Sequence, residues 1–249
     1  MPRVSGDIKE TYQELSKAIR SPFNLVLEGE SEVGKEHFAR LIHQERNWEG
    51  QFVVYDCEQT GQGQSDIVKK LTSETFLDKL RQPTGRDTFF LRRLDLLKGI
   101  LHAQLSDFFE ELVGSGQFSR KDLLSLGIIG SVQPNGNRFS PDNVQLNRFL
   151  DILFCLRIRI LPLRERKAEI PRLVDRFVRF FNREHKREVE GISPEALEIL
   201  IQHDWPNNVC ELRTEIERAI TLTKDHQTVT PDALSDHLVG SASRTRSLD

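Results

Sequence analysis

The stretch that decides the fold is Asn24-Leu-Val-Leu-Glu-Gly-Glu-Ser-Glu-Val-Gly-Lys-Glu36. It begins with an apolar run at 24–27, passes through a loop that holds Gly29 and Gly34, and enters a segment whose apolar residues recur at helical spacing. Glycines let backbone N–H groups turn inward, and the start of a helix adds further donors, so such a loop can hold phosphate oxygens. Lys35 would reach the terminal phosphates of a nucleotide. The sequence therefore predicts a phosphate-binding loop between a buried strand and a helix.

This loop supplies the expected nucleotide contacts, with ATP or ADP as the possible ligand. The Ser or Thr that usually follows the lysine and touches Mg²⁺ is replaced by Glu36. The structural alternative is an ordinary glycine turn with an exposed lysine, but the strand–loop–helix context favours the nucleotide loop. The candidate nucleotide-binding residues are Gly29, Glu30, Ser31, Glu32, Val33, Gly34, Lys35 and Glu36.

Composition is ordinary for a globular protein. The chain has 249 residues, 37% apolar and 29% charged, with a formal net charge of −3, so no global basic field predicts direct DNA binding. No apolar run approaches the ~20 residues of a membrane helix, and no secretory signal is expected, so we predict a cytoplasmic protein without membrane association. Cys57, Cys155 and Cys210 fit a reducing compartment, and each is interpreted as a small buried apolar residue.

Strand-like runs alternate with helical patterns over the first two thirds of the chain. This alternation predicts a five-stranded parallel α/β domain of phosphate-loop type at 1–165. An all-helical domain is expected at 166–238, and a disordered tail at 239–249. The expected strands are 24–27, 51–55, 87–91, 126–132 and 157–160; helical patterns occupy 7–20, 66–81, 96–113 and 147–155, with loops at 58–66 and 134–143. In the second domain, helices are expected near 170–181, after the cap Ser193-Pro194, from Asn208 (as a capping box with Glu211) through Leu222, and briefly after Thr230.

The third strand ends in two arginines, Arg92 and Arg93. A phosphate-loop ATPase needs acidic residues there, one to hold Mg²⁺ and one to polarise the attacking water. If the strand continued, the two side chains would point to opposite sides. One arginine could replace Mg²⁺ as a phosphate counter-charge; we favour the alternative that both are solvated or pair with carboxylates such as Asp95. In either case a guanidinium opposes a divalent cation, so no Mg²⁺ is expected.

Several motifs in order carry a family resemblance. The chain resembles the AAA+ domain of sigma-54-dependent transcription activators (bacterial enhancer-binding proteins) over roughly residues 8–238. That resemblance implies an AAA+ fold in which the second domain is a helical lid. The motifs are Gly29-Glu-Ser-Glu-Val-Gly-Lys-Glu36, Ala39-Arg-Leu-Ile-His43, Phe52-Val-Val-Tyr-Asp-Cys57, Leu161-Pro-Leu-Arg-Glu-Arg166 and Trp205-Pro-Asn-Asn-Val-Cys-Glu-Leu212.

Departures from the family pattern fall on catalytic positions. The resemblance places Arg92 and Arg93 at the acidic pair, Gln133 near the γ-phosphate sensor, Phe149 and Cys155 at the arginine fingers (with Arg148 one place away), and Cys210 at the lid arginine that touches nucleotide. The loop that grips sigma-54 has no counterpart, because the segment between Cys57 and Arg86 is too short for it. Arg164-Glu-Arg166 is interpreted as a charged linker, and His43 as a core or surface residue with no metal.

These observations predict a degenerate regulatory AAA+ module. We expect it to bind nucleotide, to show little hydrolysis and not to contact sigma-54 directly. Its partners would be proteins, either in a homo-oligomeric ring or as an intact AAA+ homologue. Two alternatives stay open: an ATPase whose site is completed by a partner subunit, and a nucleotide-free interaction scaffold.

Overall fold

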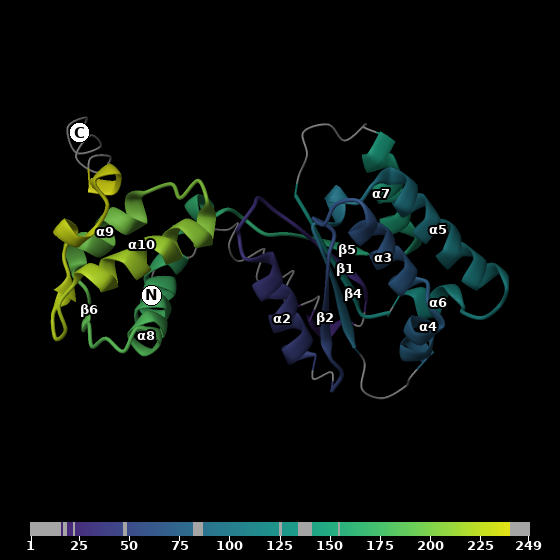
Figure 1. Ribbon diagram of the computed structural model, residues 1–249, viewed down its shortest axis with the longest axis horizontal. Coiled ribbons are helices and arrows are strands. Elements are labelled where there is room, and N and C mark those ends of the chain that lie inside the picture. The colour runs from purple at the N-terminus through teal and green to yellow at the C-terminus, as the bar shows by residue number, and fades with distance from the viewer. Residues whose placement is uncertain are drawn as a thin grey trace. The chain divides into compact units, whose positions relative to one another are not determined.

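The computed structural model describes residues 16, 19–21, 23–46, 49–81, 87–124, 126–133, 141–153 and 155–239. The predicted helix at 7–20, the loop at 134–140 and the tail after 239 lie mainly outside these residues. The chain divides into two compact units (Figure 1). Among the described residues, the larger unit lies within 16–30 and 34–160, and the smaller comprises Ser31–Val33 and 161–239.

A parallel sheet forms the centre of the larger unit. It has five strands in the order β2-β3-β4-β1-β5, and every neighbouring pair is parallel. The prediction of a five-stranded parallel α/β domain is therefore confirmed. Because all carboxyl ends meet at one edge, the loop after β1 lies near the ends of its neighbours. The strands are β1 (Leu25–Glu28), β2 (Phe52–Asp56), β3 (Thr88–Arg92), β4 (Ile128–Val132) and β5 (Leu156–Arg159).

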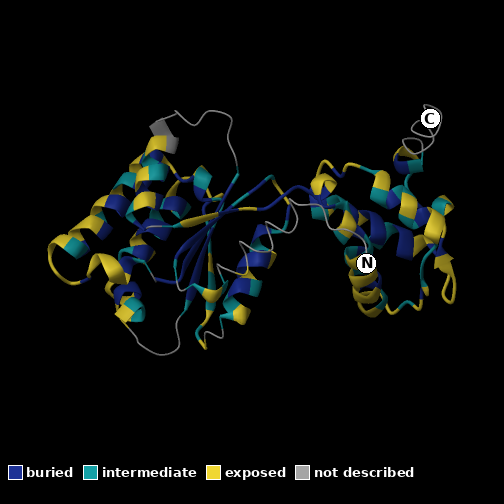
Figure 2. Ribbon diagram, turned by 180° about the vertical axis from the view of Figure 1, so that it is seen from behind, coloured by how far each residue is buried: buried dark blue, intermediate teal, exposed yellow. Residues whose placement is uncertain are grey.

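Helices cover both faces of this sheet. Figure 1 shows α2 on one side and α3, α5 and α7 on the other. Their apolar sides pack on the strands, and Figure 2 shows buried residues running through the strands and the inner helix faces. The helices are α2 (Lys35–Glu45), α3 (Gln62–Leu71), α4 (Glu74–Arg81), α5 (Gly99–Gly114), α6 (Arg120–Leu123) and α7 (Pro141–Ile152), with a 3₁₀ turn η1 at Leu94–Leu96.

Two loop predictions are wrong. The segment 58–66 was expected as loop, but α3 already begins at Gln62. The polar composition of this segment suggested a loop, but the polar Gln64 is buried in the helix. Its Nε2 donates to the backbone carbonyls of Cys57 (3.0 Å) and Leu96 (2.9 Å). The pattern expected as one helix at 66–81 is broken before α4, where Ser73 Oγ accepts from the Phe76 N–H. Likewise, the last part of the expected loop 134–143 is the first turn of α7.

One buried amide ties the start of β1 to its surroundings. Asn24 is fully buried, and its Nδ2 donates to the carbonyls of Leu123 (2.5 Å) and Leu153 (2.9 Å). Its Oδ1 accepts from the N–H groups of Leu126 and Ile128, each at 3.1 Å. The side chain therefore uses its full set of donors and the acceptor, and fixes the end of α7 and the entry to β4 around β1.

The smaller unit is largely helical around the buried Trp205. Ser193 caps α9 as predicted, with its Oγ 3.2 Å from the Ala196 N–H. The expectation of an all-helical domain at 166–238 is wrong at one short parallel pair, β6 (Gly191–Ile192) and β7 (Thr228–Val229). Strands of two residues are too short to show an alternating pattern in the sequence. The helices are α8 (Ile170–Glu184), α9 (Pro194–Gln202) and α10 (Asn208–Leu222), with 3₁₀ turns η2 (Leu163–Glu165), η3 (Lys167–Glu169) and η4 (Pro231–Ala233). Among the described residues of either unit, no helix combines the length and apolar character needed to cross a membrane.

Candidate functional site

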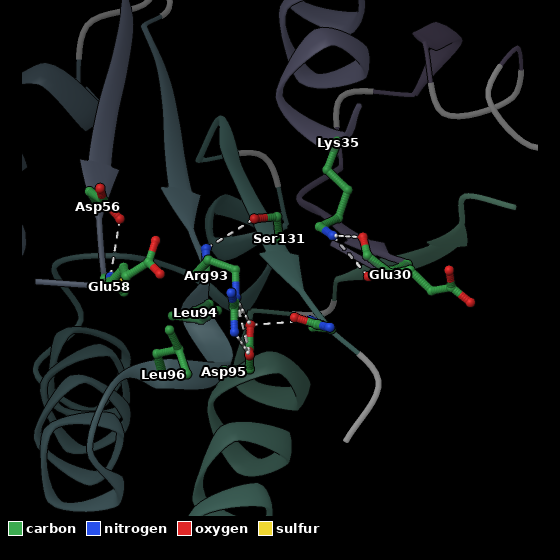
Figure 3. A network of polar contacts seen from close by, with 12 residues as sticks. Glu30, Lys35, Asp56, Glu58, Arg93, Leu94, Asp95, Leu96 and Ser131 are labelled. Atoms are coloured by element: carbon green, nitrogen blue, oxygen red, sulfur yellow. Dashed lines mark hydrogen bonds and ion pairs between the residues drawn. The ribbon is translucent and has the colours of Figure 1, made fainter. Parts of the chain in front are cut away.

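The loop between β1 and α2 holds a lysine that is bonded back onto the loop itself. Gly34 has φ +94°, a conformation that any residue with a Cβ would strain to adopt. Lys35 follows as the first residue of α2 and is 8% exposed. Its Nζ donates to the carbonyls of Gly29 (2.8 Å) and Glu30 (2.6 Å). Figure 3 shows Lys35 turned toward Glu30. A phosphate that reached this amine would take the place of carbonyl oxygens.

Glu36, the residue after the lysine, is paired with another side chain of its own helix. Glu36 Oε1 forms an ion pair with Arg40 Nη2 at 2.8 Å, one helical turn further along α2. A negative charge in the first turn stabilises the helix dipole. The position where a hydroxyl would touch Mg²⁺ is thus occupied by a carboxylate that is paired within its own helix.

Three residues of the loop, Ser31–Val33, belong to the smaller unit. There the Val33 carbonyl accepts a hydrogen bond of 2.6 Å from Arg166 Nη2. Arg166 is 6% exposed and also forms an ion pair with Glu169 at 2.9 Å. The charged segment Arg164-Glu-Arg166 is therefore not a solvated face at Arg166, because this guanidinium donates to a backbone carbonyl and pairs with a carboxylate.

The first turn of α10 contacts the same loop residues. Asn208, at φ +49°, donates from Nδ2 to the Ser31 carbonyl (3.0 Å) and accepts at Oδ1 from the Leu163 N–H (2.8 Å). The predicted capping box is wrong: Asn207 occupies the cap position without a side-chain bond, and Glu211 accepts from the Asn207 N–H at 2.9 Å. Asn is one of the few residues that adopt the left-handed conformation readily, which suits the backbone at Asn208.

At the end of β3, Arg92 is paired across the sheet. Its in-register neighbour on β2 is Asp56, and the Arg92 Nη2 donates to the Asp56 carboxylate. The hydrogen bond from Arg92 outweighs the opposing effect of partial burial and holds the pKa of Asp56 below its usual value, and the same bond raises the pKa of Arg92. The sequence analysis did not identify Asp56 as the partner of Arg92. Its position directly after the predicted strand 51–55 could have indicated it, because that strand proves to be the neighbour of β3.

Arg93 does not continue the strand. Its φ of +54° turns the chain, so the condition for opposite side-chain directions, a strand that continues through Arg93, is not met. Its backbone N–H donates to Ser131 Oγ (3.0 Å), and its Nη2 lies 3.1 Å from Asp95 Oδ2 (Figure 3). The Asp95 carboxylate is only 2% exposed and also accepts from the Gln133 N–H at 3.1 Å. The alternative that the arginines pair with carboxylates is therefore the one observed.

These strand ends do not fit a hydrated divalent cation. Mg²⁺ is bound through one or two free carboxylates with several waters. Here Asp56 and Asp95 are each engaged by a guanidinium, from Arg92 and Arg93. The net charge of these four side chains is zero, and no carboxylate among them is left without a cationic partner. The two carboxylates at this edge are therefore already paired with guanidinium groups of the same strand end.

The predicted finger positions lie elsewhere in the larger unit and are not exposed cations. Phe149 belongs to the core, 1% exposed, and burial raises the pKa of the Cys155 thiol to about 12. Arg148 is bound by α5 of its own unit, with its Nη2 2.9 Å from both Asp107 and Glu110. Shifting the alignment by one residue, so that Arg148 takes the finger position, therefore does not supply an unpaired arginine.

The three cysteines differ. Cys57 is buried, and burial raises its pKa to about 12; Cys155 is partly buried. Cys210 is exposed, so its interpretation as a buried apolar residue is wrong: it lies on the outer side of α10 and lines a cavity of the smaller unit. His43 is half-buried and lies 2.8 Å from Thr88 Oγ1, which agrees with a structural role.

Two family models match the chain. Residues 2–71 match the sigma-54 interaction domain, and residues 164–249 match the AAA+ ATPase lid domain. The transcriptional regulatory protein XylR of Pseudomonas putida is 29% identical over 248 residues, covering 91% of this chain and 42% of the relative. The nitrogen fixation protein VnfA of Azotobacter vinelandii is 30% identical over 251 residues, covering 95% and 48%. The chain thus spans about half the length of the curated relatives it matches.

Solved structures share the fold. NtrX from Brucella abortus, crystallised in complex with ATP, aligns with a TM-score of 0.65 and 20% identity, covering 97% of this chain and 58% of that one. The replication initiator DnaA bound to AMPPCP and single-stranded DNA aligns with a TM-score of 0.57 and 15% identity, covering 98% and 67%. At these identities the likeness concerns the fold alone.

Proposed function

We infer that this chain, an AAA+ module of the sigma-54-activator type, acts in transcription control as a regulatory module that binds ATP or ADP without hydrolysing it. The observation that carries this proposal is the closed network of Arg93, Asp95 and Gln133, which occupies the strand ends where a hydrolytic site needs free acidic groups. The paired carboxylates at the strand ends are what would distinguish this module from an active ATPase of the same family.

Nucleotide binding is supported by the loop. Gly34 keeps the left-handed backbone, and Lys35 keeps its amine inside the loop. Bound phosphates would receive hydrogen bonds from that amine in place of the Gly29 and Glu30 carbonyls. Because both bonds are made to neutral acceptors, exchanging them for charged phosphate oxygens gives a stronger, charge-assisted interaction.

Loss of hydrolysis follows from the same edge of the sheet. Each electrostatic or base group that an enzyme loses costs roughly 10²–10⁴ in rate. Here Arg92 and Arg93 replace the acidic pair and engage the two nearby carboxylates. Arg148, the arginine nearest the expected finger positions, is bound to α5. These losses together leave little turnover within one subunit, even though such effects are not additive.

Action through protein partners completes the proposal. The segment between β2 and β3 is taken up by α3 and α4 in its described part, which supports the inference that it carries no sigma-54-gripping loop. The module would then work within a homo-oligomeric ring or together with an intact AAA+ homologue. It would contact neither sigma-54 nor DNA directly.

A nucleotide titration tests the binding half of this proposal. Calorimetry with ATP and ADP, each with and without Mg²⁺, should give saturable binding whose affinity changes little on addition of Mg²⁺. Lys35→Ala should abolish it, whereas Lys69→Ala, which removes an exposed lysine paired with Asp66 on α3, should not. Absence of binding by the wild-type protein would support a nucleotide-free scaffold instead. Turnover that appears only with an intact homologue would support a partner-completed ATPase.

A further inference from the structure

A second cluster of chemistry-bearing side chains lies in the smaller unit. The ligand atoms of His203, Glu211 and His237 all lie within 4.8 Å of one another. They come from three separate segments: His203 directly follows α9, Glu211 is in the first turn of α10, and His237 is in the helical turn 236–239. Within the described part of the chain, no other three His, Cys, Asp or Glu residues come together in this way.

Glu211 is held in place by backbone. One carboxylate oxygen, Oε2, accepts from the Asn207 N–H at 2.9 Å, and the other, Oε1, lies 3.3 Å from His203 Nε2. The Oε1 atom and the His203 ring nitrogen therefore face each other with the carboxylate orientation already fixed. Such outer hydrogen bonds are what orient metal ligands in proteins.

The two histidines are also positioned by packing. The His203 ring stands edge-on to Trp205, with ring centroids 4.8 Å apart and an interplanar angle of 82°, and Trp205 is fully buried. His237 is exposed, but its neighbour Leu238 and the preceding Leu234 are 1% and 3% exposed, so the turn that carries it is anchored in the core. The rings of His203 and His237 lie 5.9 Å apart. Trp205 thus packs against His203 and the Asn207 N–H binds Glu211, while His237 is the exposed member of the cluster on an anchored turn.

Access to the cluster is open. Glu211 and His237 line a solvent-open cavity of about 600 Å³ between α10 and the segment around Ser235, with Cys210 and Thr214 on its wall. A cation can enter there and keep a coordination position for water. Tetrahedral zinc with bonds of about 2.0–2.1 Å needs ligand atoms about 3.3 Å apart. The His203–Glu211 distance already meets this, so only the exposed His237 has to move.

We propose that His203, Glu211 and His237 bind a transition-metal dication, with Zn²⁺ as the best match, through two imidazole nitrogens and one carboxylate oxygen. This ligand set, with the fourth position open, is one that zinc adopts in proteins, and imidazole disfavours Mg²⁺ and Ca²⁺. The bound ion joins the end of α9, the start of α10 and the last described turn. It therefore stabilises the smaller unit and restrains the chain around His237.

The chain contains a matched comparison. His226 lies 3.1 Å from Glu188, so it too is a histidine–carboxylate pair, but both side chains are more than 70% exposed and no third ligand joins them. If histidine–carboxylate proximity alone bound the metal, this pair would do so as well. His226→Ala is therefore the control for His237→Ala, and both changes remove an exposed side chain.

The test is a metal titration of the full chain, without a polyhistidine tag and after treatment with a chelator. Calorimetry with ZnCl₂ should give one site per chain, Co²⁺ should give the intense visible absorption of tetrahedral coordination, and Zn²⁺ should raise the unfolding temperature. His237→Ala should weaken the affinity at least tenfold, while His226→Ala and Cys210→Ser leave it unchanged. No stoichiometric binding, an equal loss in His226→Ala, or a loss in Cys210→Ser that assigns the metal to the thiol would overturn the proposal.

Discussion

The guanidinium of Arg93 lies 3.1 Å from the carboxylate of Asp95, two residues further along the chain, and that carboxylate is 2% exposed. The left-handed backbone at Arg93 makes this contact possible, because it turns the chain out of β3 into the 3₁₀ turn that carries Asp95. The same carboxylate accepts from the Gln133 N–H after β4. The Asp95 carboxylate thus links Arg93, after β3, to Gln133, after the neighbouring strand β4.

Removing this arginine should destabilise the larger unit. Arg93→Ala leaves the buried carboxylate of Asp95 with the Gln133 N–H as its one hydrogen-bond donor among the described residues. We expect a loss of about 1–3 kcal/mol in the free energy of unfolding. Urea denaturation measures it. Arg157→Ala is the control, since its pair with Glu28 is exposed by 45% and 30% and is screened by solvent, worth less than about 1 kcal/mol. Equal losses in the two variants would show that the Arg93 pair has no special role.

The buried amide of Asn24 should contribute more. Asn24→Ala removes two donated and two accepted hydrogen bonds at a fully buried site, which leaves backbone groups of Leu126 and Ile128 without these partners. We expect a loss of about 2–5 kcal/mol by thermal or urea unfolding. Asn147→Ala, which removes an exposed bond to Arg157, should cost far less. A small loss in Asn24→Ala would mean that water replaces the amide.

Acid should weaken the smaller unit through Glu215. Burial raises the pKa of this carboxyl, but hydrogen bonds from Arg218 (2.9 Å) and from Ser235 Oγ and N–H (2.7 Å each) outweigh it and hold the pKa below its usual 4.5. A folded pKa below the unfolded one contributes stability that is complete above pH 4.5 and is lost as the pH falls through the lowered value.

Glu215→Gln should therefore lower stability at neutral pH and flatten its decline between about pH 5 and pH 3. Chemical denaturation across that range measures both effects. Glu217→Gln, on the exposed side of α10 beside His185, should keep the wild-type slope in this acid range. An unchanged slope in Glu215→Gln would contradict the assignment.

Thiol reactivity should separate the cysteines. Cys210 is exposed, whereas burial raises the pKa of Cys57 and Cys155 to about 12 and suppresses their thiolates. A disulfide reagent at neutral pH should modify one thiol per chain quickly and the other two only after unfolding. Cys210→Ser should remove the fast phase. A fast phase that persists in that variant would place a reactive thiol elsewhere.

The features that could be predicted from the sequence are those marked by regular local patterns. Glycine spacing around Lys35 and apolar runs such as Phe89–Leu91 are local signals, so the loop, the sheet and the succession of helices were accessible. The partners of Arg92 and Arg166 were not, because they depend on residues brought together by the fold: Asp56 on the neighbouring strand and the Val33 carbonyl.

Local backbone conformation accounts for other misses. Nothing in the composition marks Arg93 as left-handed, and Asn208 carries an amide that fits a cap as readily as a tertiary bond. Gln64 reads as a loop residue although it is buried, because its polarity serves two backbone carbonyls. Each of these depends on hydrogen bonds between residues far apart in sequence, which periodicity does not report.

The most direct test of the central claim is phosphate release from ATP with Mg²⁺, measured under single-turnover conditions on protein already shown to bind the nucleotide. We predict that the wild-type chain releases no more phosphate than Lys35→Ala, because Arg92 and Arg93 neutralise the carboxylates at the strand ends. Magnesium-dependent release by the wild-type chain alone, abolished in Lys35→Ala, would contradict it.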